Sequence, residues 1–174
     1  LHGARSSFLS NPEIHYDVGS RIDGFVAHVA VFRRITVLDI RPNQSNIGNI
    51  SFREADLMAE LPDHLVSCCD SLSCLHAIEH FGLGRYGDPI DASGHERGLA
   101  NLHRMLSPGG TLYLSVPIGP DRVEFNSQRV FSIRTMLDLL HGRFDLAAFC
   151  YVDDAGALSE GVAMTDAAIA SNFG

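Results

Sequence analysis

Short apolar strands alternate with helical segments along most of this chain, and this alternation limits the folds that the chain can adopt. Helical patterns follow strand-like runs in the order expected of βαβ units, which form a mainly parallel sheet. The sequence therefore predicts an α/β fold, a three-layer Rossmann-like sandwich. We predict strands at 13–18, 35–40, 50–52, 67–75, 111–116 and 144–152, and helices at 24–34, 95–106 and 132–140.

The 174 residues match the length of one ordinary domain. Residues 1–12 are polar and without pattern, so we predict a flexible N-terminal arm followed by a single domain over 13–174. We expect long loops at 81–94 and 117–129, and a weakly patterned tail after 153. The chain opens with Leu1 rather than Met, which leads us to expect a fragment.

Composition narrows the partners that we expect. The chain has 13 basic against 21 acidic residues, a net charge of −8. This balance argues against a nucleic-acid backbone or an anionic membrane as partner, and favours a small-molecule substrate. The oligomeric state is left open.

The cysteines argue for a reducing compartment. Cys68, Cys69, Cys74 and Cys150 form neither a CxxC pair nor a spaced disulfide framework, and we expect them to be reduced. No segment has the length and apolarity of a membrane span, and no signal peptide is visible. We therefore expect a cytoplasmic protein.

Polar and small residues stand where the first three predicted strands end. Asp17 ends the first strand and Gly19 follows it, where glycine allows the backbone to approach a ligand closely. Asp39 ends the second strand, 20 residues after Gly19, which is the position of a carboxylate that binds ribose hydroxyls. Asp56 and Leu57 follow the third strand, where a carboxylate and a backbone amide suit an adenine. Ligands of such sheets bind at these carboxyl ends.

The fourth strand leads into the segment His76-Ala77-Ile78-Glu79-His80. This matches the H-x-x-E-H pattern of inverted zincins, but that motif requires a helix and here it begins at a strand end. We therefore predict no metal site, with a loop cation held by acidic and histidine side chains as the alternative. Imidazole titrates near neutral pH, so His76 and His80 are the candidate general bases.

The whole pattern resembles the class I S-adenosylmethionine-dependent methyltransferases. The resemblance rests on the segments CCDSLSCLHAIEHFGLG and GLANLHRMLSPGGTLYLSVP, and the GDPID, SVPIG and FN–RVF segments are similar to the DUF268 family. It implies S-adenosylmethionine as cofactor. It would place Asp17 and Gly19 at the methionine part, Asp39 at the ribose, Asp56 and Leu57 at the adenine, and Leu75 with His76 beside the sulfonium.

Two departures from that family pattern have consequences. The usual Asp-x-Gly-x-Gly-x-Gly turn here has Arg21 and Asp23 at two glycine positions, which puts cofactor affinity in question. The fold also normally ends with an antiparallel strand, and the tail GVAMTDAAIASNFG does not resemble one. We therefore expect the chain to stop short of that strand, so that adding the missing residues would stabilise it and trimming the tail would change little.

Three functions are compatible with these residues. The first is methyl transfer to a small molecule, with a sugar among the candidate acceptors. The second is a degenerate methyltransferase-like binding module without catalysis. The third is a nicotinamide-dinucleotide oxidoreductase or epimerase, although G-x-G-x-x-G and Tyr-x-x-x-Lys are both absent. Arg122 and Arg129, after the fifth strand, are predicted to lie at the surface, with an acidic substrate as the alternative.

Overall fold

The computed structural model describes residues 2–42 and 47–173. Its centre is a five-stranded parallel sheet in the order β3-β2-β1-β4-β5. The strands are β1 (His15–Val18), β2 (Ile35–Asp39), β3 (Ile50–Glu54), β4 (Cys69–Leu75) and β5 (Leu106–Ser115). The chain runs outward from β1 to β3, then returns to β4 on the other side of β1. This reversal between β1 and β4 is the place where ligands of open α/β sheets bind.

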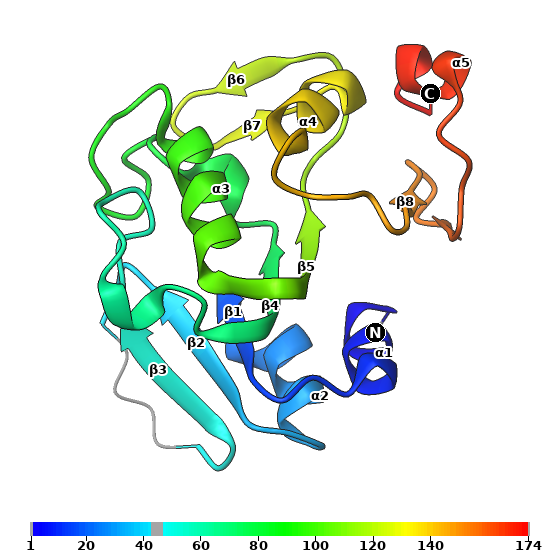
Figure 1. Ribbon diagram of the computed structural model, residues 1–174. Helices are drawn as coiled ribbons and strands as arrows, with labels where there is room; N and C mark the ends of the chain where they lie inside the picture. Colours follow the sequence, from blue (N-terminus) through cyan, green and yellow to red (C-terminus); the bar gives the residue numbers. More distant parts are fainter. Residues whose placement is uncertain (1, 43–46, 174) are drawn as a thin grey trace.

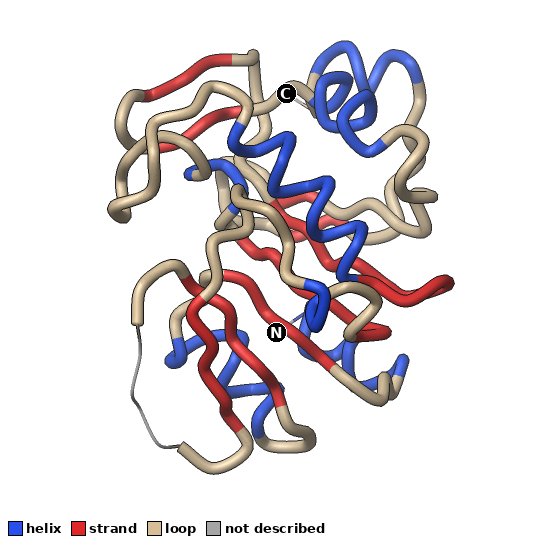
Figure 2. The backbone as a smooth tube through the Cα atoms, turned by 60° about the vertical axis from the view of Figure 1, so that its left-hand side comes forward, coloured by secondary structure: helices blue, strands red, loops and turns tan. Residues whose placement is uncertain are grey.

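Helices cover both faces of the sheet, as predicted (Figure 1). On one face lie α1 (His2–Ser10), the helical turn η1 (Ile22–Val26) and α2 (Ala27–Ala30). On the other lies α3 (Gly94–Met105), which Figure 2 shows crossing the sheet. The predicted three-layer sandwich is thereby confirmed.

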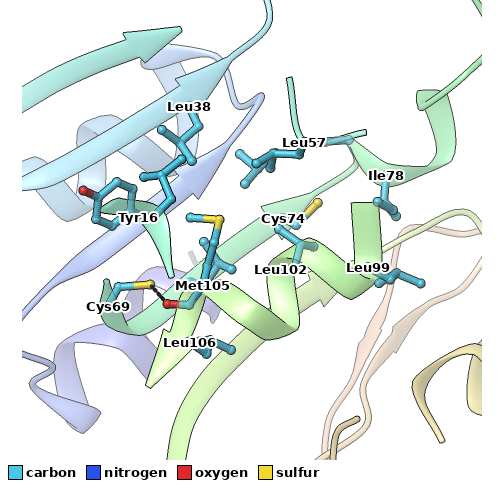
Figure 3. Packing of buried hydrophobic residues seen from close by; sticks show 14 of the residues in the cluster. Tyr16, Leu38, Leu57, Cys69, Cys74, Ile78, Leu99, Leu102, Met105 and Leu106 are labelled. Atoms are coloured by element: carbon cyan, nitrogen blue, oxygen red, sulfur yellow. Dashed lines mark hydrogen bonds between the residues drawn. The ribbon is translucent and has the colours of Figure 1, made fainter. Parts of the chain in front are cut away.

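The two faces of β2 belong to two separate apolar clusters, because side chains alternate along a strand. Leu38 packs toward α3, where Leu102 and Met105 are fully buried (Figure 3). Ile35 and Val37 pack on the opposite face against α2. Burial of a side chain of this size contributes roughly 1.5–3 kcal/mol, so these clusters hold the strand ends in place.

The first residues differ from the prediction of an unpatterned arm. They form α1, which buries Ala4 and Ser7 and packs on α2. Phe8 of α1 meets Phe32 edge to face at a centroid distance of 5.2 Å. The sequence did not predict this helix because α1 has few apolar residues. Its stability depends on contacts such as the one between Phe8 and Phe32.

The loop predicted at 117–129 contains a hairpin, β6 (Arg122–Glu124) paired with β7 (Gln128–Val130). The helix predicted from Ser132 is confirmed as α4 (Ile133–Leu140), and the Ser132 hydroxyl accepts a hydrogen bond from the Thr135 amide at 3.1 Å. Short helical turns η2 (Asp63–Leu65) and η3 (Ile78–His80) complete the central region.

The predicted strand 144–152 is wrong over most of its length. Only β8 (Tyr151–Val152) forms, and it pairs with β9 (Leu158–Ser159) rather than with the central sheet. The turn between them is stabilised locally, since the Asp153 carboxylate accepts a hydrogen bond from the Ala157 amide at 2.8 Å. Helix α5 (Asp166–Ser171) follows. Within the described ranges, β4 is the only strand that pairs with β5.

The four cysteines are free thiols, with Cys69 and Cys74 buried. No helix in the described part of the chain is long and apolar enough to cross a membrane.

Candidate functional site

A cavity of about 90 Å³ opens at the carboxyl ends of β1, β2, β3 and β4. Six of the eight predicted site residues line it: Gly19, Asp39, Asp56, Leu57, His76 and His80. A larger hollow of about 500 Å³ lies next to it, between the turn after β1 and the ends of β2 and β3. Asp39 and Arg41 line both spaces. The smaller cavity holds both candidate bases, so we take it as the centre of the site.

The turn after β1 is built around Gly19. Its φ of 70° lies in the left-handed region, and its amide donates to the Leu38 carbonyl at 2.8 Å. A Cβ at this position would lie 3.2 Å from the Ala77 Cβ. Glycine is therefore required both by the backbone conformation and by the closeness of the segment after β4.

Asp17 holds this turn through hydrogen bonds and does not line the cavity. Its side chain is fully buried. It accepts hydrogen bonds from the Ser20 amide and hydroxyl at 3.2 and 3.1 Å, and from the Ser73 hydroxyl at 2.5 Å. Burial raises the pKa of Asp17 to about 6 despite these bonds. Asp17 thus shapes the turn that would carry a ligand.

A buried histidine that the sequence did not reveal supports Asp17. His15 contacts the Ser71 hydroxyl at 2.6 Å and the Ser73 hydroxyl at 3.1 Å, so Ser73 joins it to Asp17. Burial, with a smaller effect of Arg33, lowers the pKa of His15 to about 4. The imidazole is therefore neutral at pH 7.

The residues that replace two glycines of the family turn line the larger hollow and not the smaller cavity. Arg21 and Asp23 are exposed and pair with each other at 2.7 Å. The backbone of the turn is thus made without these two glycines, and the bulky side chains are accommodated in solvent.

Asp39 has its carboxylate at the end of β2, where a ribose would be bound, but Arg41 already holds it. The Arg41 Nε and Nη2 atoms donate to it at 2.9 and 2.7 Å, and the Arg41 amide donates at 2.8 Å. Burial acts to raise the pKa of Asp39, and the bonds and charge of Arg41 outweigh it, so that the pKa is lowered. The Arg41 guanidinium also lies over the Tyr86 ring, 4.6 Å from its centroid.

Asp56 and Leu57 lie beyond β3 in a tightly bonded turn. The Asp56 Oδ1 atom accepts from the Met58 amide at 2.8 Å. The Leu57 carbonyl accepts from the Asn101 side chain of α3 at 2.9 Å, and Asn101 also donates to the Ala59 carbonyl. Helix α3 therefore positions the predicted adenine end of the site through Asn101, a residue that the sequence pattern did not single out.

The segment after β4 brings three titratable residues together. His76 has a φ of 54°, unusual for a residue other than glycine, and its Nδ1 atom lies 3.3 Å from the Glu79 Oε1 atom. Glu79 lies on η3 and is buried, whereas His76 is exposed to the cavity mouth. His80 donates from Nδ1 to the Ser127 carbonyl at 2.7 Å, in the tautomer that this contact assigns.

Two residues are placed differently from expectation. Leu75 does not line the cavity. Its side chain is near Gly3, which shares that face of the sheet with Phe25. Arg129 is buried rather than at the surface, and donates to the carbonyls of Phe81 and Ala92 at 2.5 and 3.2 Å. These hydrogen bonds connect β7 to the loop after η3.

The described residues contain no group of three or more His, Cys, Asp and Glu side chains placed to hold a metal ion.

Several solved structures with a similar fold are methyltransferases, and one is a [4+2]-cyclase, SpnF. Burkholderia thailandensis 1,6-didemethyltoxoflavin-N1-methyltransferase, solved with its ligand and S-adenosylhomocysteine, is 17% identical with a TM-score of 0.60, over 91% of this chain and 73% of the other. Human N-acetylserotonin methyltransferase with SAM is 17% identical with a TM-score of 0.58, over 91% of this chain and 50% of the other. A Haloferax volcanii putative methyltransferase, solved with the Trm112 activator, is 16% identical with a TM-score of 0.57, over 88% and 71%. These likenesses define the fold class as that of the class I methyltransferases.

The family follows from the sequence itself. The model described as "Caenorhabditis protein of unknown function, DUF268" matches residues 35–160, and the chain therefore belongs to the DUF268 family. A comparison with curated proteins gave no significant match.

Proposed function

We propose that this domain binds S-adenosylmethionine at the carboxyl ends of β1 to β4 and transfers its methyl group to a small-molecule acceptor. The observation that carries the proposal is the meeting of Gly19, Asp39, Asp56 and His76 around one cavity, although they lie on four separate strand ends. Two of the similar structures contain this cofactor or its demethylated product: S-adenosylhomocysteine in the Burkholderia enzyme and SAM in the human one.

The residues fit this cofactor in three respects. Gly19 lines the cavity with its backbone alone, the Asp39 carboxylate suits a ribose diol, and Asp56 has a second oxygen without a bond to the Met58 amide. When bound, the sulfonium supplies both the methyl group and the leaving group. The protein then has to align the acceptor and receive its proton, which are the roles we assign to the cavity mouth and to His76 or His80.

The first test is calorimetric titration of S-adenosylhomocysteine into the purified protein and into Asp39→Ala. We expect the variant to lose at least tenfold in affinity, because two hydrogen bonds to a charged carboxylate would be removed. The matched control is Glu54→Ala, which removes an exposed carboxylate at the end of the neighbouring strand. Equal binding by all three proteins would contradict the assigned ribose site, and absence of binding to the folded protein would contradict the proposed cofactor.

A binding module without catalysis is the second candidate, favoured by the Arg41–Asp39 pair and by the Arg21 and Asp23 replacements. A labelled methyl-transfer assay with candidate acceptors separates the two. Cofactor binding without transfer to any acceptor would favour the module. NAD⁺ in the same calorimetric experiment tests the dinucleotide alternative.

A further inference from the structure

Glu79 is a buried glutamate of η3 that lies beside the two cavity-lining histidines. Its side chain is 2% exposed, and its Oε2 atom has no hydrogen-bond partner within the described residues. Its Oε1 atom lies 3.3 Å from His76 Nδ1 and 3.9 Å from His80 Nε2. A buried carboxylate with one bonded oxygen is unfavourable for folding, so packing does not explain why this position holds a glutamate.

The two histidines beside Glu79 differ in what their second nitrogen can do. His80 is 15% exposed, uses Nδ1 on the Ser127 carbonyl, and turns Nε2 toward Glu79. It also packs edge to face on Tyr86 at 5.6 Å. Both ring nitrogens thus face protein groups, and His80 ties η3 to the turn between β6 and β7.

His76 has the opposite arrangement. Its side chain is 64% exposed and its Nδ1 faces Glu79, and the described residues offer no hydrogen-bond partner to Nε2. The backbone is held in its left-handed conformation while the His76 amide donates to the Ser115 carbonyl at 3.0 Å. Strain of this kind is retained where it serves a site.

We propose that Glu79 is a positioning residue that holds the His76 imidazole through Nδ1, so that His76, rather than His80, presents Nε2 to the methyl acceptor as the general base. This inference rests on the proposed methyl transfer. The acceptor's proton moves to Nε2 as its oxygen or nitrogen takes the methyl group, and Glu79 stabilises the imidazolium that results.

Further titratable groups lie on the elements packed against η3. They are Cys74 of β4, Arg129 of β7, and His95, Glu96, Arg97, His103 and Arg104 of α3. The Arg97 guanidinium is directed to the Met58 carbonyl and to Asp91. Arg129 is directed to the Phe81 carbonyl, and burial raises the pKa of the Cys74 thiol, which stays protonated. The bond to Glu79 raises the pKa of His76. A histidine with a raised pKa is a stronger base, which acts once the pH exceeds that pKa.

The test is an NMR titration of ¹³C,¹⁵N-histidine-labelled protein with S-adenosylhomocysteine, using His76→Gln to assign the signal. In the unaltered protein, we expect the neutral His76 ring to carry its proton on Nδ1. In Glu79→Gln, we expect the His76 midpoint to move to lower pH, whereas the exposed-site control Glu60→Gln leaves it unchanged. With an acceptor in hand, Glu79→Gln lowers kcat roughly tenfold or more, with the KM for S-adenosylmethionine unchanged and the acid limb of kcat/KM moved to lower pH.

A proton on Nε2 of neutral His76 in the unaltered protein, or an unmoved His76 midpoint in folded Glu79→Gln, would overturn the pairing. The His76 tautomer is measured in the unaltered protein. The proposal therefore stays testable even if Glu79→Gln does not fold. Failure of S-adenosylhomocysteine to bind, measured separately by calorimetry, would instead overturn the proposed function.

Discussion

Arg41 and a bound ribose compete for the same carboxylate. Three donors of Arg41 occupy Asp39, two of them on Oδ1, so a ribose diol cannot use both oxygens while the pair is intact. The Arg41 side chain is 54% exposed, and an ion pair so open to solvent contributes only about 0.2–1 kcal/mol. Binding therefore requires a displacement of modest cost.

We expect Arg41→Gln to bind S-adenosylhomocysteine about two- to fivefold more tightly, because the competing guanidinium is removed. Calorimetric titration measures the change, and Arg34→Gln, at an exposed position outside both hollows, is the control. Weaker binding by Arg41→Gln would mean that the guanidinium contacts the ligand instead of competing with it.

Helix α3 holds the segment after β4 through a contact that has no room for a side chain. A Cβ on Gly98 would lie 2.6 Å from the Phe81 ring and 2.7 Å from the Ile78 side chain. The bare backbone of α3 thus lets η3 approach closely, and with it Glu79 and its two histidines.

Gly98→Ala is expected to destabilise the protein by about 1–2 kcal/mol. Overpacking against η3 costs roughly 1–3 kcal/mol, and the better helix propensity of alanine recovers less than about 1 kcal/mol. Urea unfolding followed by circular dichroism measures this, with Glu96→Ala on the exposed side of α3 as control. A stability equal to that of the control would show that η3 moves aside freely.

The protein as a whole carries two buried titratable groups whose effects on stability oppose each other. The folded-state pKa of Asp17, about 6, lies above its ordinary value of 3.8, so its stabilisation is full below pH 3.8 and is lost as the pH rises through 6. The pKa of His15 is about 4 against 6.5, so its stabilisation is full above pH 6.5 and is lost as the pH falls through 4. Between pH 4 and 6, the changes that the two groups cause in the free energy of unfolding nearly cancel.

The substitution His15→Gln removes the contribution of His15 to the pH dependence of stability. Relative to the unaltered protein, we expect the variant's free energy of unfolding to fall by roughly 3 kcal/mol between pH 4 and 6, since the opposing contribution of His15 is then absent. Unfolding in urea at a series of pH values gives the slope, and His103→Gln, at an exposed position, is the control. An equal pH dependence of the unfolding free energy in His15→Gln and in the unaltered protein would contradict the lowered pKa assigned to His15.

The local pattern predicted the central sheet and six of the residues that line the cavity, because both depend on short-range signals. Apolar runs of strand length mark β2, β4 and β5, and parallel strands bring their carboxyl ends to one edge. Gly19, Asp39 and Asp56 therefore meet although they are far apart in the sequence. The same reasoning failed at 144–152, where an apolar run suits a strand but a local hairpin supplies the partner for only two residues.

What the sequence by itself determined is the alternation of strands and helices, the glycine turn and the order of the strand ends, since each is a property of neighbouring residues. Only the tertiary structure decided the use of each side chain. Asp17 turns to Ser73, which is 56 residues away, Arg129 reaches the carbonyl of Phe81, and the Glu79 Oε1 atom lies 3.3 Å from His76 Nδ1. Such contacts depend on distances between segments that are remote in the chain, and no pattern of adjacent residues encodes those distances.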